Sequence, residues 1–96
     1  MRNMPISVSE MRRGLLKLEA VEEEGRRHTK YTVFINDRVV ACTALSRSYR
    51  ELSDDMVNAI ARQIYIRSRD LKKIVDCTWG YDEYVELYEQ SLPRQH

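Results

Sequence analysis

The chain has 96 residues, of which 43% are hydrophobic and 32% are charged, and its formal net charge is +1 at neutral pH. This length suits one domain, since single cores usually take about 100 to 150 residues, and the composition excludes an intrinsically disordered protein. No apolar run approaches the ~20 residues of a membrane span and no apolar signal core follows the first residues, so we expect a cytoplasmic protein with no membrane partner.

The first helix is predicted to begin at Ser7. Ser7 and Glu10 have the spacing of a capping box, in which each side chain accepts a hydrogen bond from the other residue's amide. An apolar stripe then follows at helical spacing, formed by Val8, Met11, Leu15 and Leu18. Gly25 is the natural stop, but the three glutamates at 22–24 oppose the helix macrodipole there. The alternative is a shorter helix with residues 18–24 extended.

A hairpin is predicted next, because residues 31–35 and 39–45 are rich in β-branched and aromatic side chains. The Asn-Asp pair between them suits a tight primed turn. With a two-residue loop, Val33 faces Val40 and Tyr31 faces Cys42 on one apolar side. The two cysteines of the chain, Cys42 and Cys77, lack the close spacing of a zinc knuckle or a redox pair, and two histidines are too few to complete a ligand set, so we expect both to be reduced thiols in the core or half-buried.

Three helices are predicted after the hairpin. Ser53 caps the first, Ser68 caps the second, and a tyrosine-rich stripe defines the third. This stripe consists of Tyr81, Tyr84, Val85, Tyr88 and Leu92. The overall prediction is an α+β fold with an N-terminal helix, a central antiparallel β-hairpin or three-stranded sheet, and three helices. We predict a single domain over residues 1–96, with a core at 7–66 and a helical C-terminal extension at 67–96.

Charge is distributed unevenly along the chain. Residues 1–50 carry ten Lys and Arg against six Asp and Glu, whereas residues 51–96 carry six against nine. Residues 76–90 hold five acids and no base. Such blocks are typical of a basic face that binds phosphates together with an acidic end, although ordinary solvated faces produce them equally often.

Most enzyme signatures are absent from the sequence: there is no Walker loop, dinucleotide-binding glycine pattern, nucleophile elbow or His-x-x-x-His pair. We expect no metal and no cofactor. His28 is the one plausible catalytic side chain, because an imidazole can exchange a proton near neutral pH. Its neighbours Arg26, Arg27 and Lys30 would hold a phosphodiester. The plain alternative is a partly exposed strand histidine without a role.

The order Gly25-Arg26-Arg27-His28-Thr29-Lys30-Tyr31, then a hairpin, then Ser46-Arg47-Ser48-Tyr49-Arg50-Glu51 before a helix, resembles the HicA-like toxins and their archaeal relatives. The resemblance covers roughly residues 7–66. It implies a double-stranded-RNA-binding-like fold, metal-independent cleavage of messenger RNA with His28 as the catalytic residue, and neutralisation by a HicB-type antitoxin. RNA would then be bound by Arg26, Arg27, Lys30, Arg47 and Arg50.

A helix-turn-helix is the competing interpretation. Residues 57–76 fit its template, with Tyr65 where the turn often has glycine. The second helix would then present four basic residues to base edges and phosphates of DNA. These residues are Arg67, Arg69, Lys72 and Lys73. A third hypothesis is a protein-interaction module that uses the acidic, tyrosine-rich C-terminal helix.

Overall fold

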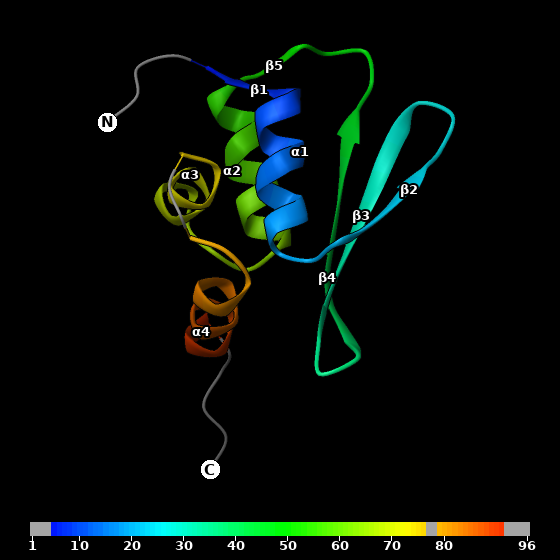
Figure 1. The fold of residues 1–96 in the computed structure, drawn as a ribbon. Helices are drawn as coiled ribbons and strands as arrows, with labels where there is room; N and C mark the ends of the chain where they lie inside the picture. The colour runs from blue at the N-terminus through cyan, green and yellow to red at the C-terminus, as the bar shows by residue number, and fades with distance from the viewer. Residues whose placement is uncertain (1–4, 77–78, 92–96) are drawn as a thin grey trace.

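The computed structural model describes residues 5–76 and 79–91 and has the predicted α+β architecture (Figure 1). Its elements in chain order are β1 (Ile6–Ser7), α1 (Val8–Lys17), β2 (Val21–Glu24), β3 (His28–Ile35), β4 (Arg38–Ser46), β5 (Glu51–Leu52), α2 (Asp54–Gln63), α3 (Ser68–Asp76) and α4 (Tyr81–Ser91). Strands β2, β3 and β4 form an antiparallel sheet in that order, and β1 pairs with β5. Helices α1 and α2 lie on one face of the three-stranded sheet, and α3 lies on their other side (Figure 1).

Helix α1 begins as predicted and ends early. The Ser7 hydroxyl accepts from the Glu10 amide at 3.1 Å, and the Glu10 carboxylate accepts from the Ser7 amide at 3.0 Å. The helix closes at Leu18, and the next residue, Glu19, takes the left-handed conformation with φ 59°. The prediction that Gly25 ends this helix was therefore wrong, and the alternative of a shorter helix was correct, although the extended part is residues 21–24 and not 18–24. The extended segment includes strand β2, so the sheet has three strands.

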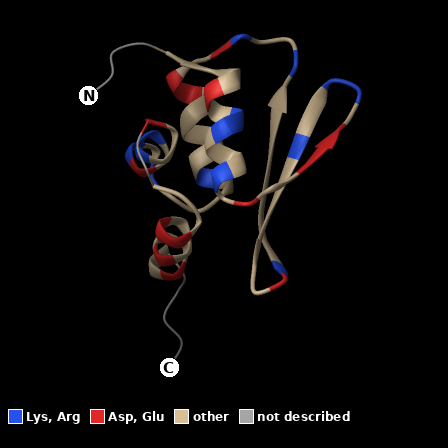
Figure 2. Ribbon diagram, in the orientation of Figure 1, with Lys and Arg blue, Asp and Glu red and all other residues tan. Residues whose placement is uncertain are grey.

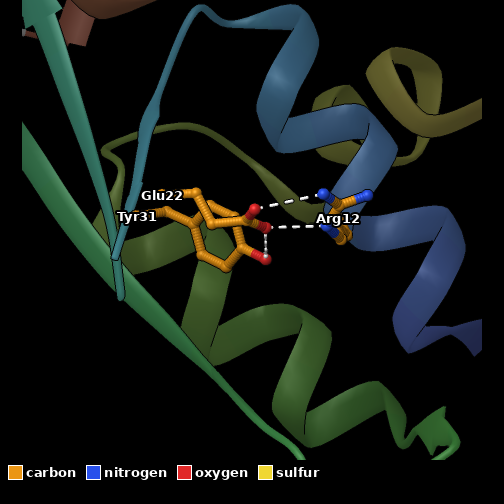
Figure 3. A network of polar contacts seen from close by, with 3 residues as sticks. All are labelled: Arg12, Glu22 and Tyr31. Carbon is orange, nitrogen blue, oxygen red and sulfur yellow. Dashed lines mark hydrogen bonds and ion pairs between the residues drawn. The ribbon is translucent and has the colours of Figure 1, made fainter. Parts of the chain in front are cut away.

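A network of polar contacts explains how a strand with three glutamates fits here (Figure 3). The Arg12 guanidinium of α1 donates to both carboxylate oxygens of Glu22 in β2, at 2.7 and 3.1 Å. The buried Tyr31 of β3 donates its hydroxyl to the same carboxylate at 2.7 Å. These hydrogen bonds, from Arg12 first and then from Tyr31, lower the pKa of Glu22. Burial and the bond to Glu22 raise the pKa of Tyr31.

The β3–β4 hairpin has the predicted turn and an unpredicted bulge. Asn36 and Asp37 both have positive φ, at 52° and 63°, as a primed turn requires. After Phe34 pairs with Val39, the register shifts and Val33 pairs with Ala41, so the predicted pairing with Val40 was wrong.

This shift reverses which side of β4 faces the core, because side chains alternate along a strand and one extra residue moves the rest to the opposite face. Ala41, Thr43 and Leu45 are buried. Cys42 is exposed, so the expectation of a core or half-buried thiol was wrong for this residue. Cys77 lies outside the described residues.

Helices α2 and α3 are joined by a tight turn. Ser53 caps α2 as predicted, accepting from the Met56 amide at 3.2 Å. At the other end of α2, Tyr65 has φ 65°. The Tyr65 amide donates to the Arg62 carbonyl, and the Ile66 amide donates to the Ala61 carbonyl at 3.0 Å. These two bonds form a Schellman motif, which stops the helix and redirects the chain.

Helix α3 packs closely against α1. A Cβ at Gly14 would lie 2.9 Å from a methyl group of Val75, so the absence of a side chain permits this approach. Ser68 was predicted as the cap of α3, but it is the first helical residue. The Leu71 amide donates to the carbonyl of the preceding residue, Arg67, and not to the Ser68 hydroxyl. The Ser68 hydroxyl donates to the Asn58 side chain of α2, so a contact between the two helices replaces the cap.

Helix α4 is attached mainly through Tyr84. This side chain is fully buried, and its hydroxyl donates to the Ile64 carbonyl at 2.9 Å. Its burial raises the pKa of the Tyr84 phenol. Tyr88 is half-buried, with its ring 5.8 Å from that of Tyr65, whereas the predicted stripe residue Leu92 lies outside the described residues.

One cluster of buried side chains includes residues of the sheet and of all four helices, so α3 and α4 contribute to the same core as the region before them. Within residues 5–76 and 79–91, no helix has the length and apolar character needed to cross a membrane.

Candidate nucleic-acid interface

The turn between β2 and β3 presents two adjacent arginines to solvent. Arg26 and Arg27 are exposed, and the flanking residues close the turn through a bond from the Gly25 amide to the His28 carbonyl at 2.8 Å. A Cβ at Gly25 would lie only 2.9 Å from that carbonyl oxygen. Glycine at this position therefore allows the two strands to approach while the arginines remain outside.

Arg47, which follows β4, is fastened to this turn by two hydrogen bonds. Its amide donates to the Arg27 carbonyl at 3.0 Å, and its guanidinium donates to the Gly25 carbonyl. Residues about 20 positions apart in the sequence are thereby brought together at one end of the sheet. We call this group, Arg26, Arg27, His28 and Arg47, the sheet-end cluster.

His28 is the first residue of β3, is exposed, and pairs with Ser46 of β4. Side chains alternate along a strand, so His28 and Lys30 lie on the face opposite to the buried Tyr31. This is the sheet face that α1 and α2 leave open (Figure 1). Among the described residues the His28 imidazole makes no hydrogen bond or ion pair, so it is accessible to an incoming ligand.

The charges around His28 are not neutralised within the described part of the chain. The arginines of the sheet-end cluster and Lys30 make no ion pair there. Figure 2 shows Lys and Arg in the β2–β3 turn and again in the segment that follows β4. Two acids of β2 lie nearby in register, Glu24 opposite Thr29 and Glu23 opposite Lys30, but neither makes an ion pair with these cations within the described residues. Unpaired cations on an exposed turn favour binding of phosphate groups.

Two other predicted residues lie further from the turn. Lys30 is two residues along β3 from His28, opposite Ala44. Arg50 is exposed but belongs to the approach to β5, where its carbonyl accepts from the Val8 amide at 2.8 Å. The Arg50 backbone is therefore tied to the start of α1, and no hydrogen bond or ion pair within the described residues joins Arg50 to the sheet-end cluster.

The four cations of the helix-turn-helix hypothesis lie in α3 and just before it, on the other side of α1 and α2 from the sheet (Figure 1). Arg67, Arg69 and Lys73 line a cavity whose other wall is formed by α4, whereas Lys72 does not line it. Sequence reasoning did not assign Arg62, Tyr65 or Trp79 to this surface, although all three line the cavity. The one signal available was Tyr65 in a turn position that favours glycine.

Over residues 5–76 and 79–91, no three His, Cys, Asp or Glu side chains come close enough together to hold a metal ion. No family model, no curated protein and no solved structure matches this chain.

Proposed function

We propose that this protein binds RNA through the sheet-end cluster and cleaves it with His28, in the manner that its resemblance to the HicA-like toxins implies. The observation that carries the proposal is the attachment of Arg47 to the β2–β3 turn. It brings three exposed arginines, which make no ion pair within the described part of the chain, next to an exposed imidazole. An antitoxin-like protein partner belongs to the same proposal.

The order of elements supports this proposal. The HicA-like pattern has a helix, three strands and a second helix, with a glycine shortly before a histidine on a strand. Here α1, the strands β2, β3 and β4, and α2 follow in that order, and Gly25 precedes His28 at the start of β3. The first of these three strands would be β2, which lies within the segment 18–24 that the sequence offered as extended.

The chemistry needs a base and a positive charge near one phosphate. The His28 imidazole would accept the proton of the ribose 2′-hydroxyl, and the 2′-oxygen would attack phosphorus. The bond from phosphorus to the 5′-oxygen breaks, leaving a 2′,3′-cyclic phosphate; the 5′-oxygen takes a proton from water, and the proton held by His28 returns to the hydroxide that this water becomes. The arginines would stabilise the negative charge that develops on the phosphoryl oxygens.

RNA binding is tested by a filter-binding titration at several salt concentrations. Each phosphate contact releases counterions, so for a single strand it steepens the slope of the logarithm of the binding constant against the logarithm of the salt concentration by about 0.7. The double variant Arg26→Ala/Arg47→Ala should therefore bind more weakly, with a slope lower by roughly 1.4. Arg38→Ala, an exposed arginine at the opposite end of the sheet, is the matched control and should bind as the wild type does. If the wild type retains no RNA even at low salt, the proposal fails.

A helix-turn-helix DNA-binding regulator is the second candidate function. The observation in its favour is the Schellman turn at Tyr65, which joins two packed helices whose inward residues Ile60, Ala61, Leu71 and Ile74 are buried. If α3 reads DNA, Arg69→Ala or Lys72→Ala should abolish selection of a duplex site, because base-reading contacts are worth ~1 to 3 kcal/mol each. If selection from random duplexes enriches no motif, this candidate is excluded.

A further inference from the structure

A cavity of about 760 Å³ lies between the α2–α3 turn and α4, and we call it the helical groove. The residues of its wall that matter here are Arg62, Tyr65, Arg67, Arg69, Lys73 and Trp79. Its volume falls within the ~300 to 1,000 Å³ of sites that take small molecules. It is separate from the sheet-end cluster, which lies at the end of the sheet on the other side of α1 and α2 (Figure 1).

The helical groove is strongly cationic. Its wall carries four basic side chains and a single acid, the buried Asp70. Arg69 is 3.9 Å from the Asp70 carboxylate, and among the described residues the other three cations make no ion pair. A site with this excess of guanidinium groups favours a phosphate, because each guanidinium can donate two hydrogen bonds to it.

Two aromatic rings accompany these cations. The Tyr65 side chain is 54% exposed. Its backbone has the left-handed conformation that glycine adopts without strain, so a tyrosine here is not explained by the turn alone. The Lys73 ammonium lies over the Trp79 ring, with its nitrogen 4.9 Å from the ring centroid. Trp79 is half-buried and packs against the core, so the exposed Tyr65 ring beside the arginines provides the stacking surface for a flat aromatic group.

We propose that the helical groove binds a nucleoside phosphate, with the phosphate on Arg62, Arg67 and Arg69 and the base against Tyr65. The ligand is a free nucleotide or the terminal nucleotide of a strand, since both offer the same base and phosphate. Helix α4 forms the opposite wall of the groove, so a ligand beside α3 would also meet α4. This site is independent of the proposed RNA cleavage.

Trp79 is the only tryptophan of the chain and lines the groove, so its fluorescence reports binding there. The full chain would be titrated with AMP, ATP, inorganic phosphate, and a short oligonucleotide with or without a 5′-phosphate. Isothermal calorimetry on the same ligands detects binding that leaves the fluorescence unchanged. We expect saturable binding of the nucleotides, with inorganic phosphate at least 10-fold weaker. Preference for the 5′-phosphorylated oligonucleotide over AMP would identify the terminal nucleotide of a strand as the ligand.

The variants Arg67→Ala and Arg69→Ala should each weaken nucleotide binding by about 10-fold or more. Arg26→Ala removes the same charge from the sheet-end cluster and should leave the affinity unchanged. Tyr65→Asn keeps a residue that tolerates the left-handed conformation but removes the ring. It should therefore weaken the binding of AMP and leave the binding of inorganic phosphate unchanged. The proposal is overturned by the absence of saturable nucleotide binding in both measurements, by equal affinity for AMP and phosphate, or by an equal loss in Arg26→Ala.

Discussion

The sheet-end cluster and the helical groove are both basic, but they differ in shape. In the sheet-end cluster, the arginines stand on an exposed turn, held in place by the hydrogen bonds of Arg47. In the helical groove, the cations line a cavity closed on one side by α4 and share it with Asp70. An exposed turn can contact a backbone that passes across it, whereas a half-open groove between two elements can hold a single group. Two blocks of similar charge in one sequence can therefore serve different ligands.

The largest expected effect concerns His28. If the sheet-end cluster is catalytic, His28→Ala should lose about 100-fold to 10,000-fold of the RNA cleavage rate, the usual contribution of a general acid or base. Cleavage would be measured as RNA integrity in the presence of EDTA, with circular dichroism to show that the fold is kept. Equal RNA integrity with the wild type and the variant would leave a binding surface without chemistry.

We expect substitutions in the sheet-end cluster and in the helical groove to act independently of each other. Arg69→Ala should weaken nucleotide binding by about 10-fold and leave RNA retention unchanged, while Arg26→Ala should do the reverse, because charged hydrogen bonds contribute ~1.5 to 3 kcal/mol each. Parallel calorimetry and filter binding on both variants would measure this. If each variant weakened both ligands alike, the two regions would form one binding surface.

Gly14 tests the support of the helical groove. Alanine at this position would bring its Cβ to 2.9 Å from Val75, and overpacking costs about 1 to 3 kcal/mol against a gain of ~1 kcal/mol in helix propensity. We expect Gly14→Ala to be less stable by about 1 kcal/mol in urea unfolding, with weaker nucleotide binding and unchanged RNA binding. Arg13→Ala, an exposed change on the same helix, should stay within about 0.5 kcal/mol of the wild type. A more stable Gly14→Ala protein would show that α3 can move away without cost.

Tyr84 tests the attachment of α4. The variant Tyr84→Phe keeps the buried ring but removes the bond to the Ile64 carbonyl, which should cost about 1 kcal/mol of unfolding free energy. Tyr81→Phe is the control, since the Tyr81 hydroxyl makes no hydrogen bond within the described residues. Equal urea midpoints for both variants would mean that ring burial alone holds α4.

The smallest expected effect is the acid sensitivity of the contact between α1 and β2. The pKa of Glu22 is lower in the folded protein than in the unfolded one, so its contribution is present above the unfolded pKa and is lost as the pH falls through the folded pKa. Glu22→Gln should therefore destabilise the protein at neutral pH and reduce its further loss of stability in acid. Urea unfolding at neutral pH and at about pH 3 measures this, with Glu23→Gln as the matched change of charge. A pH dependence identical to that of the wild type would contradict a role for this carboxylate.

Features that depend on neighbouring residues were predictable from the sequence. The capping box of Ser7 and Glu10, the Asn-Asp turn and the Ser53 cap each form between groups a few residues apart, so the sequence determines them before any tertiary contact exists. The positions of Ile60, Ala61 and Ile64 on the buried side of α2 follow from helical periodicity in the same way.

Only the tertiary structure decided the remaining features, because they depend on partners distant in the chain. The Arg12 and Tyr31 contacts of Glu22 accommodate β2, whose own residues do not favour a strand. The bulge that exposes Cys42 moves Ala41, Thr43 and Leu45 into the core beneath α1 and α2, and no local rule specifies it. The hydrogen bonds of Arg47 to the turn at Gly25 likewise form only after the chain has folded. The same is true of the placement of α4 across the helical groove from the cations of α3. Sequence therefore determined the helices, the hairpin turn and the caps of α1 and α2, while long-range packing determined the third strand, the bulge and which charged side chains meet.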